Sequence, residues 1–240
     1  MFNFTDHVVL VTGAAGNLGR AVVLAFANAG AHLVLPDRGT GRLAEALPEL
    51  KGDHVFADNV DLTDEAAVQR IVEVALRRFD RIDVLVTPGG GWLPGKPTHE
   101  TSLDDWYALF DRNFRTVLVP SRAVVPPMLA RGYGKIIHVG AAAASLQGGA
   151  NKSAHSAAKS AVLRLTESMA DELKYSGINI NCILPGVIDT TQNRADMPDA
   201  DTSDWVPPEA LADVILFLAS PAARAIHGAA IPVVGPNLRG

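Results

Sequence analysis

The stretch TGAAGNLG, from Thr12 to Gly19, decides the fold of this chain. It follows an apolar run over residues 7–11 and precedes a helical pattern over residues 20–29. Glycines have no Cβ, so they allow a tight turn and let a pyrophosphate approach main-chain N–H groups at the positive end of the next helix. In this context a glycine-rich turn predicts a dinucleotide site rather than an ordinary strand-to-helix turn.

Apolar runs and helical patterns alternate along the rest of the chain. The runs cover residues 31–35, 55–57, 84–87, 135–139, 179–184 and 230–234, and the helical patterns cover residues 64–79, 103–131, 154–175 and 208–219. Strands that are apolar on both faces and alternate with helices form parallel sheets covered on both sides. We therefore expect the α/β fold class, with one Rossmann-like, doubly wound parallel sheet of about seven strands in a single domain over residues 1–240.

Composition excludes several classes of partner. The chain is 48% hydrophobic and 20% charged, which is ordinary for a globular protein. Its net charge of −5, without a run of Lys or Arg, disfavours nucleic acid and anionic membranes as partners. The seven histidines lack metal-ligand spacing, so no metal site is expected. One cysteine, Cys182, and an N-terminus unlike a signal peptide predict a cytoplasmic protein, and no apolar run is long enough for a membrane anchor.

An aspartate at the end of the second predicted strand bears on the choice of cofactor. Asp37 follows Gly19 by eighteen positions, where a carboxylate can accept hydrogen bonds from the adenosine ribose hydroxyls and repel a 2′-phosphate. NAD is therefore favoured over NADP. The adjoining Arg38 keeps the alternative open, because a guanidinium there can bind a phosphate.

Several motifs together resemble the short-chain dehydrogenase/reductase family, from about Thr5 to Gly235. The glycine turn resembles the family's T-G-x-x-x-G-x-G, and Asp61-Leu62 resembles the pair that holds the adenine. Asn113, Lys159, Pro185-Gly186 and Thr190 fall where the family has its structural asparagine, its active-site lysine and its nicotinamide-side loop. The match in order and spacing identifies the chain as a member of the family.

The resemblance implies a bound nicotinamide cofactor and an oligomer. The residues expected to contact NAD are Gly13, Gly16, Asn17, Leu18, Gly19, Asp37, Asp61, Leu62, Gly89, Lys159, Pro185, Gly186, Ile188 and Thr190. The protein is expected to be a homotetramer or homodimer that takes a small-molecule substrate if it is active. Residues 191–206 are expected to form a substrate lid, with a surface loop as the alternative.

Two stretches of the cofactor site depart from the family pattern. The middle glycine of the motif is replaced by Asn17, with Gly16 one place earlier, and asparagine tolerates the positive φ that such a turn can require. The family's Asn-Asn-Ala-Gly after the fourth strand is replaced by Thr87-Pro88-Gly89-Gly90. Both asparagine side chains and one main-chain donor are lost, so the hydrogen bonds that hold this wall must be rearranged.

The reaction centre departs further. The family's catalytic tyrosine precedes the lysine by four residues on one helix face, and His155 occupies that position before Lys159. The family's serine corresponds to Ala141 when counted from the strand end, or to Ala142 when counted back from His155. The nearest hydroxyl, Ser145, comes three or four positions later. The resemblance thus implies that the cofactor site is retained. It also implies that the tyrosine and the serine are both replaced in the part of the site where the reaction takes place, which we call the reacting half.

Two main functions remain open. The first is an NAD(H)-dependent oxidoreductase acting on a carbonyl or secondary alcohol, with Asn113, His155 and Lys159 as its catalytic residues. Against it, imidazole reaches less far than phenol by about 2 Å, and the positive charges of Lys159 and oxidised nicotinamide disfavour the imidazolium. The second is a non-catalytic NAD-binding protein, a pseudoenzyme that senses redox state or partners an active relative. A third function is a non-redox reaction that uses bound NAD, but no residue pattern specifically supports it.

Overall fold

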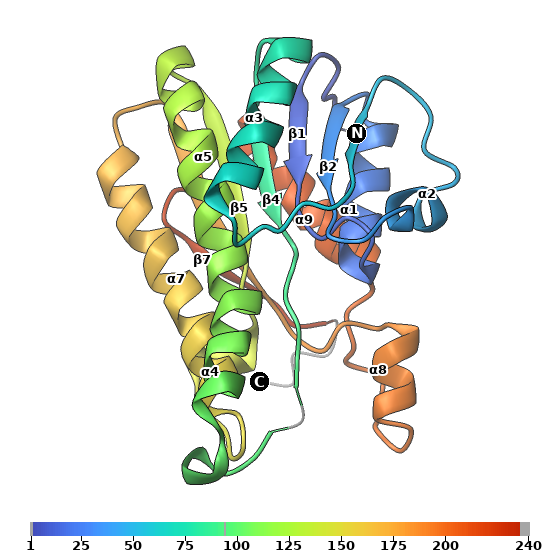
Figure 1. Cartoon of the computed structure of the whole chain (residues 1–240), viewed down its shortest axis with the longest axis vertical. Helices are drawn as coiled ribbons and strands as arrows, with labels where there is room; N and C mark the ends of the chain where they lie inside the picture. The colour runs from blue at the N-terminus through green and yellow to red at the C-terminus, as the bar shows by residue number, and fades with distance from the viewer. Residues whose placement is uncertain (1, 94, 236–240) are drawn as a thin grey trace.

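The computed structural model describes residues 2–93 and 95–235. Within them, seven parallel strands form one sheet in the order β3-β2-β1-β4-β5-β6-β7. The strands are β1 (Val8–Val11), β2 (His32–Pro36), β3 (Val55–Ala57), β4 (Val84–Thr87), β5 (Gly134–Val139), β6 (Ile178–Pro185) and β7 (Ala230–Val233). The chain winds outward from β1 to β3, crosses to β4 and winds the other way (Figure 1). This order confirms the expected doubly wound α/β fold.

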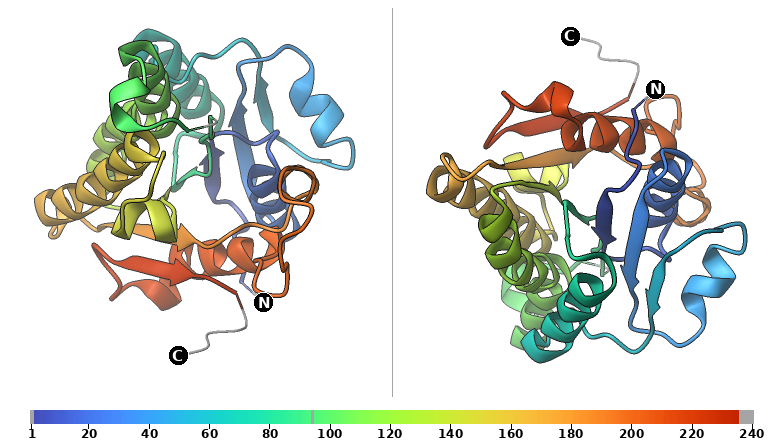
Figure 2. Two further views of the ribbon diagram at one scale, coloured as in Figure 1. Left: turned by 90° about the horizontal axis from the view of Figure 1, so that it is seen from below. Right: turned by 90° about the horizontal axis from the view of Figure 1, so that it is seen from above.

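Helices cover both faces of the sheet. The longer ones are α1 (Asn17–Asn28), α3 (Glu65–Phe79), α5 (Thr116–Arg131), α7 (Ser153–Leu173) and α9 (Pro208–Ala219). The shorter ones are α2 (Arg42–Ala46), α4 (Leu103–Phe110), α6 (Ala142–Leu146) and α8 (Thr191–Asp196), together with the single turns η1 (Thr98–Glu100), η2 (Asp111–Arg115) and η3 (Pro221–Ala223). Helices α1 and α9 pack on one face, and α3, α5 and α7 pack on the other (Figure 2).

The core explains why the strands are apolar throughout. Along β1, Val9 and Val11 point into the cluster beneath α1 and α9, whereas Val8 and Leu10 point into the cluster beneath α3, α5 and α7. All four side chains are at most 1% exposed. Because side chains alternate across a strand, a sheet covered on both faces needs apolar residues at every position.

Three features of the helices differ from the sequence-based expectations. The helix expected from residue 20 begins at Asn17, directly after Gly16 as its N-cap. The single helix expected over residues 103–131 is interrupted by a π-helical turn, η2. The short α2, α6 and α8 were not expected, because five or six residues are too few to display a helical period. None of the helices in the described part of the chain combines the length and apolarity needed to cross a bilayer.

Candidate functional site

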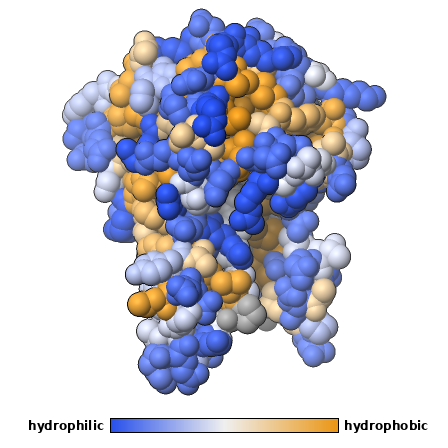
Figure 3. All heavy atoms as spheres, viewed as in Figure 1, coloured by the Kyte–Doolittle hydropathy of each residue, from blue (hydrophilic) through white to orange (hydrophobic). Residues whose placement is uncertain are grey.

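A groove with a volume of about 780 Å³ lies at the carboxyl ends of β1 and β4, where the strand order reverses. This is the position at which doubly wound sheets bind their ligands. The expected cofactor residues that line it are Gly13, Gly16, Asn17, Leu18, Gly19, Asp37, Asp61, Leu62 and Gly89. The space-filling view shows this end of the molecule hollowed between the lobe that carries α4 and the lobe that carries α8 (Figure 3).

The glycine turn depends on backbone contacts that no side chain permits. Gly13 has φ of +60°, and a Cβ there would lie 3.0 Å from the Cα of Gly89. A Cβ on Gly19 would collide with the carbonyl oxygen of Gly13. Asn17 is helical and does not have positive φ, so the expectation that its tolerance of positive φ preserves the turn was wrong; Gly13 supplies that conformation. Gly16 caps α1 without a side chain, which leaves the first N–H groups of the helix for a ligand.

Charged groups surround the groove at the end of β2. The Asp37 side chain is 6% exposed, and its Oδ1 accepts hydrogen bonds from the Gly39 N–H at 2.7 Å and from Nη1 of Arg42 at 3.3 Å. Both Arg38 and Arg42 also line the groove. A carboxylate and two guanidinium groups therefore lie together at the end of β2.

Asp61 lies farther along the groove. Its Oδ1 accepts hydrogen bonds from the N–H and the hydroxyl of Thr63, each at 2.8 Å. These hydrogen bonds lower the pKa of Asp61 below its ordinary value. A charged carboxylate is thus held in one orientation, next to Leu62, where the family resemblance implies contact with the adenine.

Asn113 supplies the rearranged hydrogen bonds of the wall after β4. It is fully buried in η2, where its Nδ2 donates to the carbonyl oxygens of Gly91 at 2.9 Å and Leu109 at 3.0 Å. Its Oδ1 accepts from the Gly91 N–H at 3.1 Å. The amide side chain of Asn113 therefore donates a hydrogen bond to the carbonyl oxygen of Gly91 and accepts one from its N–H. A Cβ on Gly90 would lie 3.0 Å from Oδ1 of Asn113 and 3.1 Å from Nζ of Lys159, so all three residues meet at this wall.

Lys159, on α7, lies against the wall after β4 but is not among the residues that line the groove. Its side chain is 6% exposed, and Nζ donates to the carbonyl oxygen of Val139 at 3.1 Å. Burial lowers the pKa of Lys159 to about 8, so the group is mostly protonated at neutral pH. An ammonium group can donate three hydrogen bonds, so two N–H groups of Lys159 remain for a ligand when one donates to the carbonyl oxygen of Val139.

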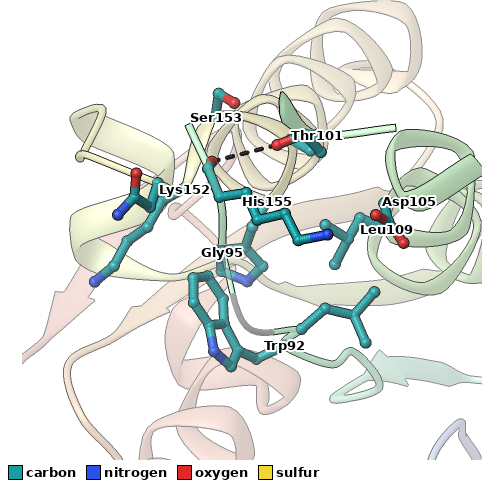
Figure 4. Close-up of a pocket in the computed structure, with 12 residues that line it drawn as sticks. Trp92, Gly95, Thr101, Asp105, Leu109, Lys152, Ser153 and His155 are labelled. Atoms are coloured by element: carbon teal, nitrogen blue, oxygen red, sulfur yellow. Dashed lines mark hydrogen bonds between the residues drawn. The ribbon is translucent and has the colours of Figure 1, made fainter. Parts of the chain in front are cut away.

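His155 lies one helical turn before Lys159 and lines a second, smaller cavity of about 200 Å³, the small pocket (Figure 4). Its ring meets that of Trp92 edge-on, with centroids 5.2 Å apart and an interplanar angle of 85°. Burial, followed by the charges of Lys159 and Lys152, lowers the pKa of His155 to about 4. The imidazole is therefore neutral at pH 7 and has a lone pair that can accept a proton.

The residues after β5 provide no hydroxyl toward the small pocket. Ala141 caps α6 and Ala142 is the first residue of that helix. The hydroxyl of Ser145 is buried, accepts from the Ala141 N–H at 3.1 Å and donates to the carbonyl oxygen of Lys159 at 3.2 Å. Ser145 thus ties α6 to α7, and it takes no part in the cavity lining.

The residues expected on the nicotinamide side run from the last residue of β6 to the N-cap of α8, outside the lining of the groove. They are Pro185, Gly186, Ile188 and Thr190. Gly186 donates to the carbonyl oxygen of Val233 at 2.9 Å, and the hydroxyl of Thr190 caps α8 by accepting from the Asn193 N–H at 3.0 Å. Ile188 pairs with Val206 through an isolated bridge, which anchors both ends of the segment over residues 191–206.

Other residues at the two cavities were not identified from the sequence. Arg42, Thr63 and Arg112 line the groove, and Lys96, Asp105 and Lys152 line the small pocket. Thr63 could have been found, because it follows Asp61 by two positions at a strand end. Arg42 and Arg112 lie on α2 and η2, neither of which was expected. No cluster of three or more His, Cys, Asp or Glu side chains suited to a metal ion occurs within the described residues.

Comparisons with known proteins agree with this geometry. The family model described as short chain dehydrogenase matches residues 7–201. A cis-4-hydroxycyclohexanecarboxylate dehydrogenase from Sinomonas cyclohexanicum is 34% identical, over 97% of this chain and 96% of that protein. A short-chain type dehydrogenase/reductase from Mycobacterium ulcerans superposes with a TM-score of 0.90 at 27% identity, covering 97% of this chain and 90% of that one. An NAD⁺-bound xylitol dehydrogenase gives 0.88 at 25% identity, covering 97% and 99%. The chain belongs to the short-chain dehydrogenase family of oxidoreductases, which use nicotinamide cofactors.

Proposed function

We propose that this protein is an NAD-dependent oxidoreductase that oxidises a secondary alcohol, with His155 as the group that accepts the hydroxyl proton. The observation that carries the proposal is a neutral, half-buried imidazole one turn before Lys159, at the edge of a cavity of substrate size. We infer that His155 stands where the family has tyrosine, and Ala141 or Ala142 where it has serine.

The groove fits a nicotinamide dinucleotide. The uncapped start of α1 and the glycine turn suit its phosphates, Asp37 suits the adenosine ribose, and Asp61 with Leu62 suits the adenine. The protons of Lys159 not used by Val139 suit the nicotinamide ribose, and the loop from Pro185 to Thr190 is proposed for the nicotinamide side. When bound, the nicotinamide supplies the acceptor for hydride.

The protonation state of His155 bears on the rates of the forward and reverse reactions at neutral pH. A neutral imidazole accepts a proton from an alcohol, but it has no readily released proton for the oxygen of a carbonyl. We therefore expect alcohol oxidation to be faster than carbonyl reduction. The alanines provide no hydrogen bond to the substrate oxygen, and loss of one such donor slows comparable reactions by roughly 10²–10³-fold. Turnover is thus expected to be slow.

The proposal is tested by following NADH formation from NAD and a panel of secondary alcohols, beginning with cis-4-hydroxycyclohexanecarboxylate, the substrate named for the Sinomonas relative. Slow NADH formation that is lost in His155→Phe, which keeps an aromatic ring against Trp92, is the expected result. The second candidate, a non-catalytic NAD-binding protein, is favoured by the missing hydroxyls beside His155. It would be established if NAD binds in calorimetry and no alcohol or ketone gives a change in absorbance.

The rate of alcohol oxidation is expected to stay nearly constant down to about pH 5 and to fall near pH 4. His155 must be unprotonated to accept a proton, and its pKa of about 4 lies below the ordinary value of 6.5, so it remains a base between these two values. On the alkaline side, loss of the Lys159 proton near its pKa of about 8 gives a second bend. The measurement is kcat/KM against pH at constant ionic strength, with circular dichroism as the control for folding. An acid limb centred near 6.5 would contradict the lowered pKa of His155, and the absence of any acid limb in the folded protein would contradict its role as proton acceptor.

Replacing Asp37 with serine is expected to change the ratio of NAD to NADP affinity by about tenfold in favour of NADP. The substitution removes the charge that repels a 2′-phosphate, and it leaves Arg38 and Arg42 at the groove to receive one. Calorimetry with the two cofactors measures the ratio. The matched control is Asp64→Ser, which removes the same charge and retains an N-cap for α3. An unchanged ratio in Asp37→Ser would show that Asp37 does not select the cofactor.

We also propose a cytoplasmic homodimer or homotetramer. Leu103 and Tyr107 on α4 are 68% and 65% exposed, and Leu129 on α5 is 46% exposed. Large exposed apolar side chains near both ends of the helical segment over residues 103–131 support an interface between copies of the chain.

A further inference from the structure

We propose that the small pocket beside His155 binds a carboxylate carried on the substrate's ring, with Lys152 as the cation that holds it. This inference rests on the proposed function, because the pocket would receive the substrate of that reaction. It adds the chemical class of the substrate, a cyclic hydroxy acid, and a residue that selects it.

The shape of the small pocket suits one ring. The loop after β4 contributes Trp92 and Leu93, α4 contributes Leu109, and the start of α7 contributes His155. Three of these four side chains are apolar, and Leu109 is 6% exposed. The volume of about 200 Å³ is below the roughly 300–1,000 Å³ of sites for drug-sized ligands. A single aliphatic or aromatic ring fills such a space.

The charge of the lining suits an anion. Lys96 and Lys152 line the pocket with Asp105, so the cations outnumber the carboxylates. Among the residues that the structure describes, neither lysine lies within 4.0 Å of a carboxylate oxygen. Lys159 adds a further positive charge behind His155. Lys96 and Lys152 are both exposed, and a substrate carboxylate would supply the countercharge that neither has among the described residues.

Lys152 is the lysine that the structure orients. Its Nζ lies 5.7 Å from the centroid of the Trp92 ring, and the same tryptophan meets His155 edge-on. Figure 4 shows Lys152 on one side of Trp92 and His155, and Asp105 and Leu109 on the other side. A cation held on an aromatic ring loses less freedom when a ligand binds. The charge of Lys152 also contributes, after burial and Lys159, to the lowered pKa of His155, in agreement with their proximity.

Calorimetry of the NAD-loaded protein with cyclohexanecarboxylate and with cyclohexanecarboxamide tests the proposal. The two ligands have the same ring and similar shape, but only the first is charged. We expect the carboxylate to bind on the order of tenfold more tightly, and we expect Lys152→Met to reduce this preference to about twofold or less. The matched control is Lys174→Met, which removes the same charge at the far end of α7, where Lys174 pairs with Asp171. The control should keep the full preference.

Equal affinities in the unmodified protein, or no measurable binding of either ligand, would overturn the proposal. So would a preference that survives in Lys152→Met but disappears in Lys96→Met. Neither ligand carries the hydroxyl to be oxidised, so binding does not depend on turnover. A carboxylate preference without oxidation of any alcohol in the panel would refute the proposed function and leave Lys152 as a carboxylate site that does not serve that reaction. Oxidation of neutral alcohols without a carboxylate preference would refute this inference and leave the proposed function intact.

Discussion

Replacing Gly19 with alanine is expected to weaken NAD binding by about a hundredfold and to lower the melting temperature. Besides its collision with the Gly13 carbonyl oxygen, the added Cβ would lie 2.8 Å from the Gly13 carbonyl carbon and 2.9 Å from the Cα of Ala14. All three contacts involve backbone, so no side-chain rotation relieves them and the turn must open. The turn positions the first N–H groups of α1, so its opening displaces the proposed donors to the cofactor phosphates. Calorimetry and thermal denaturation measure the two effects.

Gly148→Ala is the matched control for this experiment. A Cβ at Gly148 meets no other atom within 4 Å, and the residue does not line the groove. Its substitution should leave NAD affinity and melting temperature nearly unchanged. If Gly19→Ala bound NAD as tightly as the unmodified chain, the glycine turn would not be the phosphate site.

The double variant His155→Tyr with Ala141→Ser is expected to oxidise secondary alcohols at least about a hundredfold faster than the unmodified chain. A phenol at residue 155 reaches about 2 Å farther than imidazole, and a serine hydroxyl supplies the missing hydrogen bond to the substrate oxygen. The Lys159 ammonium, one turn away, favours the phenolate and so lowers the pKa of the introduced tyrosine. Steady-state kcat/KM with the best alcohol of the panel is the measurement. A second version carries Ala142→Ser in place of Ala141→Ser, because either position can supply the hydroxyl.

The control for the double variant is His155→Phe with Ala141→Ser. It has the same ring size and the same serine, but it lacks the phenol hydroxyl, so it should be nearly inactive. Equal rates for the tyrosine and phenylalanine versions, with serine at either position, would mean that residue 155 is not where proton transfer takes place in this family member.

The sequence was sufficient for the fold and predicted nine of the residues that line the groove. The glycine turn can be identified because a strand, a turn and the first residues of a helix are consecutive in the chain. Asp37 can be identified because ligands bind beyond the ends of strands in such a sheet, whereas Asp61 was identified by its resemblance to the family's adenine-holding pair. The error at Asn17 was also local: the position of the missing glycine was treated as one that needs positive φ, whereas the structure assigns that conformation to Gly13.

The reacting half required contacts between distant segments. Nothing near Asn113 in the sequence indicates that its amide pairs with both backbone groups of Gly91. The π-helical turn that holds this amide is too short to produce a hydrophobic period in the sequence. Arg42 was missed for a related reason, because it lies on a five-residue helix.

By itself, the sequence determined the parallel α/β sheet, the glycine turn and the absence of a tyrosine four residues before Lys159. These follow from the order of residues and from the limited set of backbone conformations open to them. Only the tertiary structure decided the environment of His155. Its lowered pKa comes from burial and from the approach of Lys159 and Lys152, and its ring is positioned by Trp92 from another loop. Desolvation and Coulomb interactions depend on distance in space, which the sequence does not contain.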